Sequence, residues 1–322
     1  EPSAIATSER VSIGGLLLVK HHTTLVLTEP LPGPGMRVLE ARADVRVLVL
    51  PAPTEAELAR ALPEADGVVM VMEQPALTAP LIELAPRLRV ACRFGAGYDN
   101  FDVPALTRRG IPLATTGAAN AGTVAEHALY LMLALAKRGP ALERAVKSGA
   151  WPRGFGSVEL RGRTCVVVGF GRIGRAVAQR AIAFEMKIVT VDPHVPGTEK
   201  LADALPQADF VVLACALTPR TRGLIGAQAL ARMKPGAFLV NVARGPIVDE
   251  AALVAALEAG LLAGAGLDVL ETEPPRSGHP LLAREDVVLT PHVAAFIDTA
   301  FERMAVACAQ AALAGLDGRL ER

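Results

Sequence analysis

The feature that most constrains the fold of this chain is the glycine pattern Gly-Phe-Gly-Arg-Ile-Gly at residues 169–174. It follows a short apolar run and precedes a segment with helical periodicity, the context in which G-x-G-x-x-G spacing is informative. Gly169 permits a tight turn, Gly171 lets the backbone approach a pyrophosphate, and Gly174 allows the helix to pack closely on the strand. The helix N-terminus then offers N–H groups and a positive dipole end to phosphates. The pattern predicts a dinucleotide-binding βαβ unit.

An acidic residue ends the next predicted strand. Asp192 lies 18 residues after Gly174. A carboxylate at this place accepts hydrogen bonds from the adenosine ribose hydroxyls and repels a 2′-phosphate, so it favours NAD over NADP. The alternative is that Asp192 only begins the turn before Pro193.

Short apolar runs alternate with helical segments along the chain, which is typical of parallel sheets covered by helices. A first series of strands is expected at 24–28, 45–50, 67–72 and 88–92, with a helix at 54–62. A second series is expected at 164–168, 187–192, 210–214, 237–241, 263–267 and 287–290, with helices at 172–184, 226–232 and 249–259. We detect no internal repeat. The length of 322 residues favours two domains rather than one core.

Two further helices set the expected domain boundaries. The segment 120–138 is rich in Ala, Leu and Met, so it must be buried in a large interior or against a second subunit. The Ala-rich segment 298–315 is expected to return to the first domain. We therefore expect residues 1–116 plus 296–322 to form one discontinuous domain and residues 117–295 to form the dinucleotide-binding domain.

Composition excludes several functional classes. Lys plus Arg and Asp plus Glu both number 33, which argues against a nucleic acid or an anionic membrane as the main partner. The four cysteines show no CxxC spacing, so we expect reduced thiols, no metal site and a cytoplasmic location. The apolar run 13–19 is too short to span a bilayer, and no small-residue cleavage site follows it. His21 and His22 are expected in a solvated turn.

Three polar segments lie at the ends of late predicted strands: 241–245, 266–274 and 290–292. Open α/β sheets bind ligands at this edge. Arg244 offers a planar fork of donors for a carboxylate, and His292 titrates near neutral pH. Glu273 can orient the imidazole and favour its protonated form. Each residue alone has an ordinary structural interpretation, but together they suit hydride transfer to a 2-keto acid with general acid catalysis.

These segments resemble the D-isomer-specific 2-hydroxyacid dehydrogenase family over about residues 24–315. The resemblance rests on the segments 95–100 (GAGYDN), 123–127 (TVAEH), 169–174, 233–236 (MKPG), 241–245, 266–274 and 290–292. It implies an α/β fold of two Rossmann-like domains, one flavodoxin-like and one dinucleotide-binding, with parallel sheets and the active site in the cleft between them. It also implies a homodimer built on the helix at 120–138.

The same resemblance implies residue roles. Arg244 binds substrate, His292 is the acid/base with Glu273 as its partner, and Ala96 and Gly97 grip the substrate carboxylate. Asp268 holds the nicotinamide carboxamide. The remaining cofactor contacts are expected from the glycine turn with Arg172 and Ile173, and from Asp192, Thr218, Val242, Ala243, Arg244, His292, Ala294 and Ala295. The implied activity is NAD-dependent oxidoreduction of a small unphosphorylated D-2-hydroxy or 2-keto acid, such as glyoxylate or hydroxypyruvate.

Departures from the family pattern narrow this expectation. The stretch 192–209 is too short for the additional strand that such enzymes usually contain. Val71-Met72-Glu73 stands where phosphoglycerate-type relatives carry basic residues, and Glu273 stands where formate-type relatives carry Gln. Two alternatives stay open: an NAD-sensing corepressor, and another oxidation, such as that of phosphite, on the same residues. Substrate choice depends on the loops near Met72, Tyr98 and Trp151, of which Trp151 either lines a pocket across a dimer or packs in the core.

Overall fold

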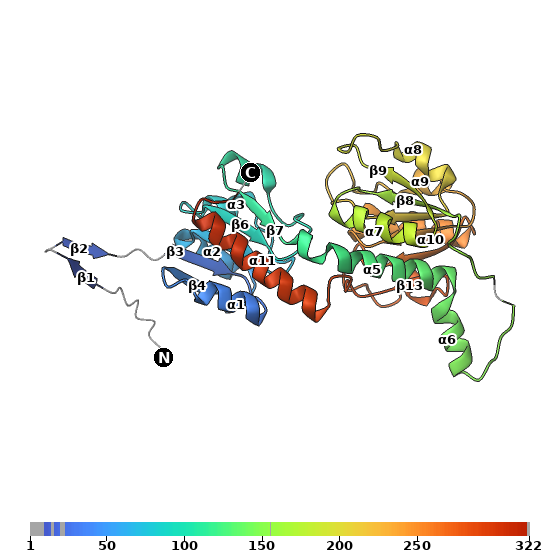
Figure 1. Ribbon diagram of the computed structural model, residues 1–322, viewed down its shortest axis with the longest axis horizontal. Coiled ribbons are helices and arrows are strands. Elements are labelled where there is room, and N and C mark those ends of the chain that lie inside the picture. Colours follow the sequence, from blue (N-terminus) through green and yellow to red (C-terminus); the bar gives the residue numbers. More distant parts are fainter. Residues whose placement is uncertain (1–9, 14–15, 20–22, 155, 321–322) are drawn as a thin grey trace. The chain divides into compact units, whose positions relative to one another are not determined.

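The computed structural model describes residues 10–13, 16–19, 23–154 and 156–320 (Figure 1). His21 and His22 lie outside these residues. The chain divides into two compact units. The first comprises Glu1–Phe94, Asn100–Thr115 and Ala305–Arg322, and the second comprises Gly95–Asp99 and Thr116–Met304.

The first unit contains a five-stranded parallel sheet. Its strands are β3 (Thr23–Leu27), β4 (Val45–Val49), β5 (Gly67–Met70), β6 (Val90–Arg93) and β7 (Leu113–Thr115). The order β4-β3-β5-β6-β7 is 2-1-3-4-5 in the unit's own numbering, which is the flavodoxin-like order. The helices are α1 (Gly33–Glu40), α2 (Glu55–Ala61), α3 (Ala79–Glu83) and α4 (Val103–Arg108), and a hairpin of β1 (Arg10–Ile13) and β2 (Leu16–Val19) precedes β3. The elements α1, α3, α4 and β7 and the hairpin were not expected. Helix α1 was missed because prolines and glycines fill positions 32–35, but they stand at its N-cap and first turn, where proline is tolerated.

The second unit contains a six-stranded parallel sheet. Its strands are β8 (Thr164–Val168), β9 (Lys187–Val191), β10 (Phe210–Leu213), β11 (Ala237–Asn241), β12 (Leu262–Leu267) and β13 (Val287–Leu289). Its helices are α5 (Gly117–Ala136), α6 (Gly139–Lys147), α7 (Arg172–Ala183), α8 (Leu201–Ala204), α9 (Ala227–Arg232) and α10 (Glu250–Glu258). The sheet order is β9-β8-β10-β11-β12-β13. The expectation of two parallel-sheet α/β domains is therefore confirmed.

The segment between β9 and β10 is short, as its sequence indicated. It contains only α8 and the 3-10 turn Leu205–Gln207. Since the structure describes all of residues 192–209 and gives them no strand, β9 forms one end of the sheet.

Helix α5 packs against its own sheet. Thirteen of its residues are buried, and Leu131, Met132 and Ala128 have no exposed surface. The core that they join also contains residues of β8, β10 and β11. Burial in a large interior, one of the two solutions expected for this helix, is thus observed for most of its surface.

The unit boundaries differ from those expected at 116 and 296. Helix α11 (Asp298–Leu316) begins in the second unit, but from Ala305 onward it belongs to the first. A Cβ on Gly35 would lie only 2.8 Å from the Ala305 Cβ, and Arg89 Nη1 donates to the Leu316 carbonyl at 2.8 Å. The turn at Gly95–Asp99 joins the second unit, where the Gly95 N–H donates to Thr116 Oγ1 at 2.8 Å.

The two sheets share a repeated segment, so the expectation of no internal repeat was wrong. Residues 62–70 (LPEADGVVM) and 205–213 (LPQADFVVL) both form a 3-10 turn, an aspartate and the third strand of a sheet. Asp66 Oδ2 accepts the Thr24 N–H at 2.8 Å, and Asp209 Oδ2 accepts the Thr164 N–H at 2.9 Å. The two segments are identical at six of nine positions, but they are short and stand 143 positions apart, so the repeat is easily missed in the sequence.

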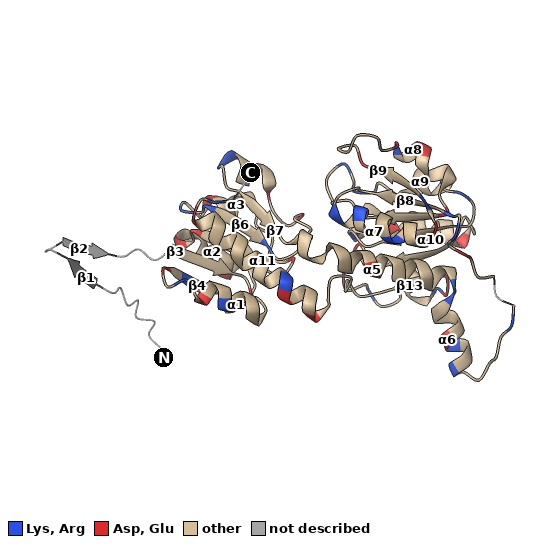
Figure 2. Cartoon of the chain, viewed as in Figure 1, with Lys and Arg blue, Asp and Glu red and all other residues tan. Residues whose placement is uncertain are grey.

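The cysteines and the helices bear on two further expectations. All four thiols are free, and burial raises the pKa of Cys165 and Cys308 to about 12. At neutral pH these two thiols are therefore protonated and are poor nucleophiles. Within the described residues we find no helix with the length and apolarity needed to cross a membrane. Basic and acidic residues are interspersed over both units (Figure 2).

Candidate active site

The glycine turn connects β8 to α7 in the expected way. Gly169 has a φ of 92°, a conformation that residues with a side chain rarely adopt. A Cβ on Gly174 would lie 1.9 Å from the Gly169 carbonyl oxygen, so the turn is compatible only with glycine there. A Cβ on Gly171 would meet nothing within 4 Å. The backbone is thus open to a ligand at Gly171 and tightly packed on either side of it.

The start of α7 fits the pyrophosphate of a dinucleotide. Gly171 is its N-cap residue, and no side chain caps the helix. Arg172 and Ile173 occupy the first two helical positions, and Arg172 is exposed. The first-turn N–H groups and this guanidinium can therefore bind an anion.

Asp192 follows β9 and is tied to the same turn. Its Oδ2 accepts the Phe170 N–H at 2.8 Å, and its Oδ1 accepts the His194 N–H at 2.9 Å. A carboxylate has further lone pairs, so these bonds leave acceptor capacity for a ribose hydroxyl. The turn before Pro193 and the ribose contact are therefore compatible interpretations of Asp192.

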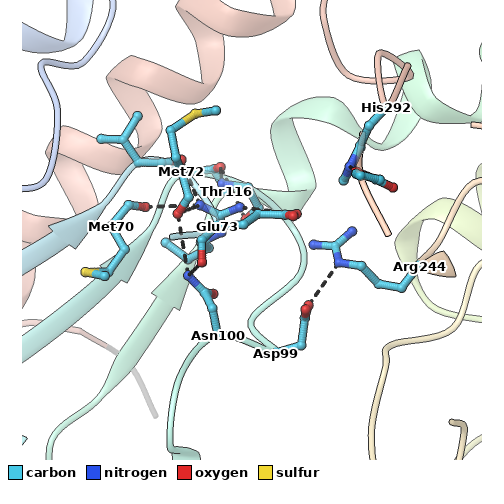
Figure 3. A network of polar contacts seen from close by, with 12 residues as sticks. Met70, Met72, Glu73, Asp99, Asn100, Thr116, Arg244 and His292 are labelled. Carbon is cyan, nitrogen blue, oxygen red and sulfur yellow. Dashed lines mark hydrogen bonds and ion pairs between the residues drawn. The ribbon is translucent and has the colours of Figure 1, made fainter. Parts of the chain in front are cut away.

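Arg244 lies after β11, where contacts with Asp99, Ala243 and Gly97 orient it. Its Nε donates to Asp99 Oδ1 at 3.0 Å, and its Nη1 donates to the Ala243 carbonyl at 2.8 Å (Figure 3). A Cβ on Gly97 would lie 1.8 Å from Arg244 Nη2, so the guanidinium is packed against the backbone of the turn that holds Ala96 and Gly97. The structure thus brings together Gly97 and Arg244, two of the predicted substrate-binding residues.

His292 and Glu273 form the predicted pair. His292 Nδ1 lies 2.8 Å from Glu273 Oε2, and Glu273 Oε1 accepts the Leu270 N–H at 2.9 Å. Burial would raise the pKa of Glu273, but the hydrogen bonds from His292 and Leu270, with the charges of His292 and Arg244, lower it overall. Glu273 is therefore ionised at neutral pH. Because it faces Nδ1, the opposite nitrogen, Nε2, is the one that can exchange a proton with a ligand.

The backbone at His292 is constrained. Its φ is 55°, in the left-handed region, and its N–H donates to the Asp268 carbonyl at 2.7 Å. Non-glycine residues in this conformation are uncommon and concentrate at functional sites. The constraint fixes the direction in which the imidazole projects.

Asp268 has a role in the structure that the sequence did not indicate. Its carboxylate accepts hydrogen bonds from Thr290 Oγ1 at 2.6 Å and from the N–H groups of Val293 and Ala294 at 2.9 Å each. Burial would raise the pKa of Asp268, but these bonds and one from His127 lower it. The ionised carboxylate therefore organises the loop that carries His292, and its expected contact with a carboxamide stays a prediction.

The other expected cofactor residues follow neighbouring strands. Thr218 lies in a turn after β10, where its N–H donates to Thr221 Oγ1 at 2.8 Å. Val242 and Ala243 follow β11, and Ala294 and Ala295 follow His292. They all belong to the second unit, with the glycine turn.

Sequence analysis did not predict three groups of contacts around the candidate site. Asp99 orients Arg244, and Asn241 Nδ2 donates to the Arg244 carbonyl at 2.9 Å while its Oδ1 accepts the Ala243 N–H. The Arg175 guanidinium lies 4.4 Å from the Phe170 ring centroid. Only Asn241 carried a signal, since an Asn just after a strand often bonds the backbone of the following turn.

Comparison with known proteins agrees with this geometry. The profile of the D-isomer specific 2-hydroxyacid dehydrogenase NAD binding domain matches residues 129–294. The chain belongs to this family. Its domain of residues 129–294 is the family's NAD-binding domain, and NAD is the cofactor that the glycine turn and Asp192 fit.

Individual relatives have different names. The chain is 43% identical over 249 residues to a D-3-phosphoglycerate dehydrogenase of Archaeoglobus fulgidus, a match covering 74% of this chain and 47% of the relative. It is 38% identical over 297 residues to a glyoxylate reductase of Pyrococcus furiosus, covering 87% and 88%. The crystal structure of a glyoxylate reductase from Paecilomyes thermophila aligns with a TM-score of 0.85 at 28% identity, covering 93% and 97%.

The chain spans about half the length of the phosphoglycerate dehydrogenases that it matches. It spans most of the glyoxylate reductase length.

Proposed function

We propose that this chain is an NAD-dependent oxidoreductase that transfers a hydride between nicotinamide and C2 of a small unphosphorylated D-2-hydroxy or 2-keto acid. The observation that carries the proposal is the His292–Glu273 pair at 2.8 Å, which lies in the same unit as Arg244 and the glycine turn. Figure 3 draws the side chains of Arg244 and His292 projecting toward a common region.

Each residue of the set has a defined task. NAD supplies or accepts the hydride when it is bound. Arg244 offers a guanidinium that binds the substrate carboxylate and polarises the ketone. His292 Nε2 delivers a proton to the ketone oxygen during reduction, and takes it back during oxidation. Glu273 remains ionised, holds Nδ1–H and stabilises the imidazolium.

The family resemblance gives the loop after β5, in the first unit, a part in substrate choice. Arg93 is only 7% exposed, and its Nη1 donates to the carbonyls of Val71 and Met72 at 2.7 Å each. Glu73 lies 3.8 Å from the same guanidinium. The basic group near this loop is thus engaged by carbonyls and a carboxylate, which disfavours a phosphorylated substrate.

A phosphoglycerate-type activity is the second candidate, favoured by the 43% identity to the Archaeoglobus relative. A panel of 2-keto acids with NADH separates the two. We expect turnover with glyoxylate, hydroxypyruvate, pyruvate or a longer 2-keto acid, and at least about tenfold lower kcat/KM with 3-phosphohydroxypyruvate, roughly 1.4 kcal/mol. Preference for the phosphorylated acid would establish the second candidate instead.

The same panel, extended by assays of NAD with phosphite and with 2-hydroxy acids, addresses the remaining alternatives. A corepressor-like binding protein would bind NADH without oxidising it in the presence of any 2-keto acid. An enzyme of another oxidation would reduce NAD with phosphite while leaving 2-hydroxy acids unchanged.

We also propose that the protein is a homodimer that uses the exposed side of α5. A groove of about 800 Å³ runs beside Leu129, Leu133 and Phe184. Tyr130 on α5 is 49% exposed and Trp151 is 77% exposed, so Trp151 does not pack in the core of this chain. Large exposed apolar side chains of this kind suit a subunit interface. Sedimentation should give a dimer at micromolar concentration, and a stable monomer would contradict the proposal.

The free thiols favour a reducing compartment such as the cytoplasm.

A further inference from the structure

The proposed catalytic groups lie on two separate segments of the second unit. Arg244 precedes a 3-10 turn at Gly245–Ile247 and helix α10, while Glu273 lies on the loop that follows β12. Proton transfer to a ketone held by Arg244 requires these segments to keep a fixed relation. We infer that Glu250, Glu271 and His279 form a latch that holds the two segments together, and that they are positioning residues for the reaction proposed above, on which this inference rests.

The two glutamates bond each other's backbone. The Glu271 N–H donates to Glu250 Oε1 at 2.6 Å, and the Glu250 N–H donates to Glu271 Oε1 at 3.3 Å. Glu250 is the first residue of α10, and Glu271 lies two positions before Glu273. This reciprocal pair therefore joins the segment after Arg244 directly to the loop that carries Glu273.

His279 completes the latch. Its Nε2 lies 3.0 Å from Glu250 Oε2, while its Nδ1 accepts the Leu281 N–H at 3.4 Å. Since Nδ1 is an acceptor, Nε2 carries the hydrogen and donates it to the carboxylate. Both oxygens of Glu250 are thus hydrogen-bonded.

The burial of Glu250 argues that it does more than fill space. The residue is 8% exposed, and a carboxylate removed from water is costly unless its oxygens are bonded. An apolar residue could pack at the start of α10, but it could not accept the Glu271 N–H or the His279 hydrogen. The carboxylate is suited to fixing the loop.

The adjoining backbone leaves the loop little room to move toward Arg244. A Cβ on Gly245 would lie 1.9 Å from the Leu270 carbonyl and 2.4 Å from the Glu271 nitrogen. Leu270 in turn donates its N–H to Glu273 Oε1. The contacts therefore run from Glu250 through Glu271 and Leu270 to Glu273, and from there to His292 Nδ1.

The experiment compares Glu250→Ala, Glu250→Gln and His279→Gln. Glu250→Ala removes the two hydrogen bonds that the Glu250 carboxylate accepts, from the Glu271 N–H and from His279. Glu250→Gln keeps an acceptor for the Glu271 N–H but presents an amide to His279. Asp286→Asn is the matched control, because it disrupts the Arg284–Asp286 ion pair of 2.7 Å at the start of β13, in the same unit. Three quantities are measured: the His292 pKa by NMR on the protein without substrate, the pH dependence of kcat/KM for 2-keto acid reduction, and the Kd for NADH.

The latch predicts a graded result. Glu250→Ala should lower the His292 pKa by about one unit, because the carboxylate of Glu273 would no longer be held against the His292 imidazole. The same variant should lower kcat/KM at pH 7.5 about tenfold. Glu250→Gln and His279→Gln should give smaller shifts in the same direction. The Kd for NADH should change less than about twofold in every variant, and Asp286→Asn should match the unmodified protein.

Other outcomes contradict either the latch or the proposed function. An unchanged His292 pKa in a folded Glu250→Ala protein overturns the latch. If Glu250→Ala does not fold, an unchanged His292 pKa in His279→Gln and Glu250→Gln overturns it equally. If the unmodified protein reduces no 2-keto acid but the His292 pKa still falls in the variants, the latch stands and the proposed function fails.

Discussion

The two parallel sheets share an order but differ at the edge where ligands bind. After the first strand of the second unit, β8, only Gly169, Phe170 and Gly171 precede α7. After β3 in the first unit, five residues precede α1. Prolines stand at positions 30 and 32 of this connection and at position 34 in the first turn of α1. Proline has no N–H to donate to a phosphate. The residue after the second strand also differs: Asp192 follows β9, whereas the buried Leu50 follows β4.

This difference separates what the fold provides from what the loops provide. The shared aspartates, Asp66 and Asp209, lie at the start of the third strand of each sheet, away from the ligand edge. They serve the architecture, and both units retain them. Among the residues that the structure describes, the dinucleotide features occur in only one unit, because they depend on a few loop residues rather than on topology.

The largest expected effect is on NADH affinity, and it distinguishes the glycines at the third position of α7 and of α1. Gly174→Ala places a Cβ 1.9 Å from the Gly169 carbonyl oxygen, so the turn must move, and NADH affinity should fall by about 100-fold or more. The matched variant Gly35→Ala meets Ala305 at 2.7–2.8 Å in the first unit. It should lower the free energy of unfolding by about 1–3 kcal/mol without altering NADH affinity. NADH fluorescence titration and thermal unfolding measure both, and equal NADH affinity in the two variants would remove the distinction between the units.

An intermediate effect should come from Asp192. We expect the unmodified protein to prefer NADH over NADPH by at least about tenfold, or roughly 1.4 kcal/mol, because the carboxylate repels a 2′-phosphate. Asp192→Ser should narrow this gap. The measurement is kcat/KM with each cofactor, and equal use of both by the unmodified protein would disprove this role.

The smallest effect should come from the shared aspartates. Burial would raise the pKa of Asp209, but hydrogen bonds from Lys234, the Thr164 N–H and Arg163 lower it overall. A lowered folded pKa means that the ionised carboxylate stabilises the fold above its unfolded pKa, and that this stability is lost as pH falls through the folded value. Asp209→Asn should cost about 1 kcal/mol at pH 7 and almost nothing near pH 2. Denaturant unfolding should give Asp66→Asn a similar cost at pH 7, and a cost confined to one of the two would show that the repeated aspartates are not equivalent.

Much of the fold was predictable because its signals are local. Apolar runs gave β8–β13 to within two residues at each end, and Thr54 with Glu57 marked the start of α2, where Thr54 Oγ1 accepts the Glu57 N–H. β7 was missed because Leu113–Thr115 is short and its residues are only partly buried. The boundary within α11 was misplaced because helical periodicity does not show which sheet each turn of a helix contacts.

The candidate site was predictable where chemistry needs particular residue types, as for Arg244, Glu273 and His292. The supporting contacts were not, because they join residues far apart in the sequence. Asp268 with Val293 and Ala294, and Glu250 with Glu271, are pairs that only the folded loops bring together. Nothing in an isolated Glu or Asp indicates which distant N–H it will accept.

The catalytic roles of His292 and Glu273 are tested by the pH dependence of 2-keto acid reduction, measured on the unmodified protein beside Glu273→Gln and His292→Ala. Since ionised Glu273 favours the imidazolium, the His292 pKa should lie above about 6.5, and reduction should decline as pH rises through it. Glu273→Gln should move this decline to lower pH. His292→Ala should lower turnover by about 10²–10⁴ while NADH still binds. A His292→Ala protein that binds NADH normally and keeps near-normal turnover would show that His292 is not the proton donor.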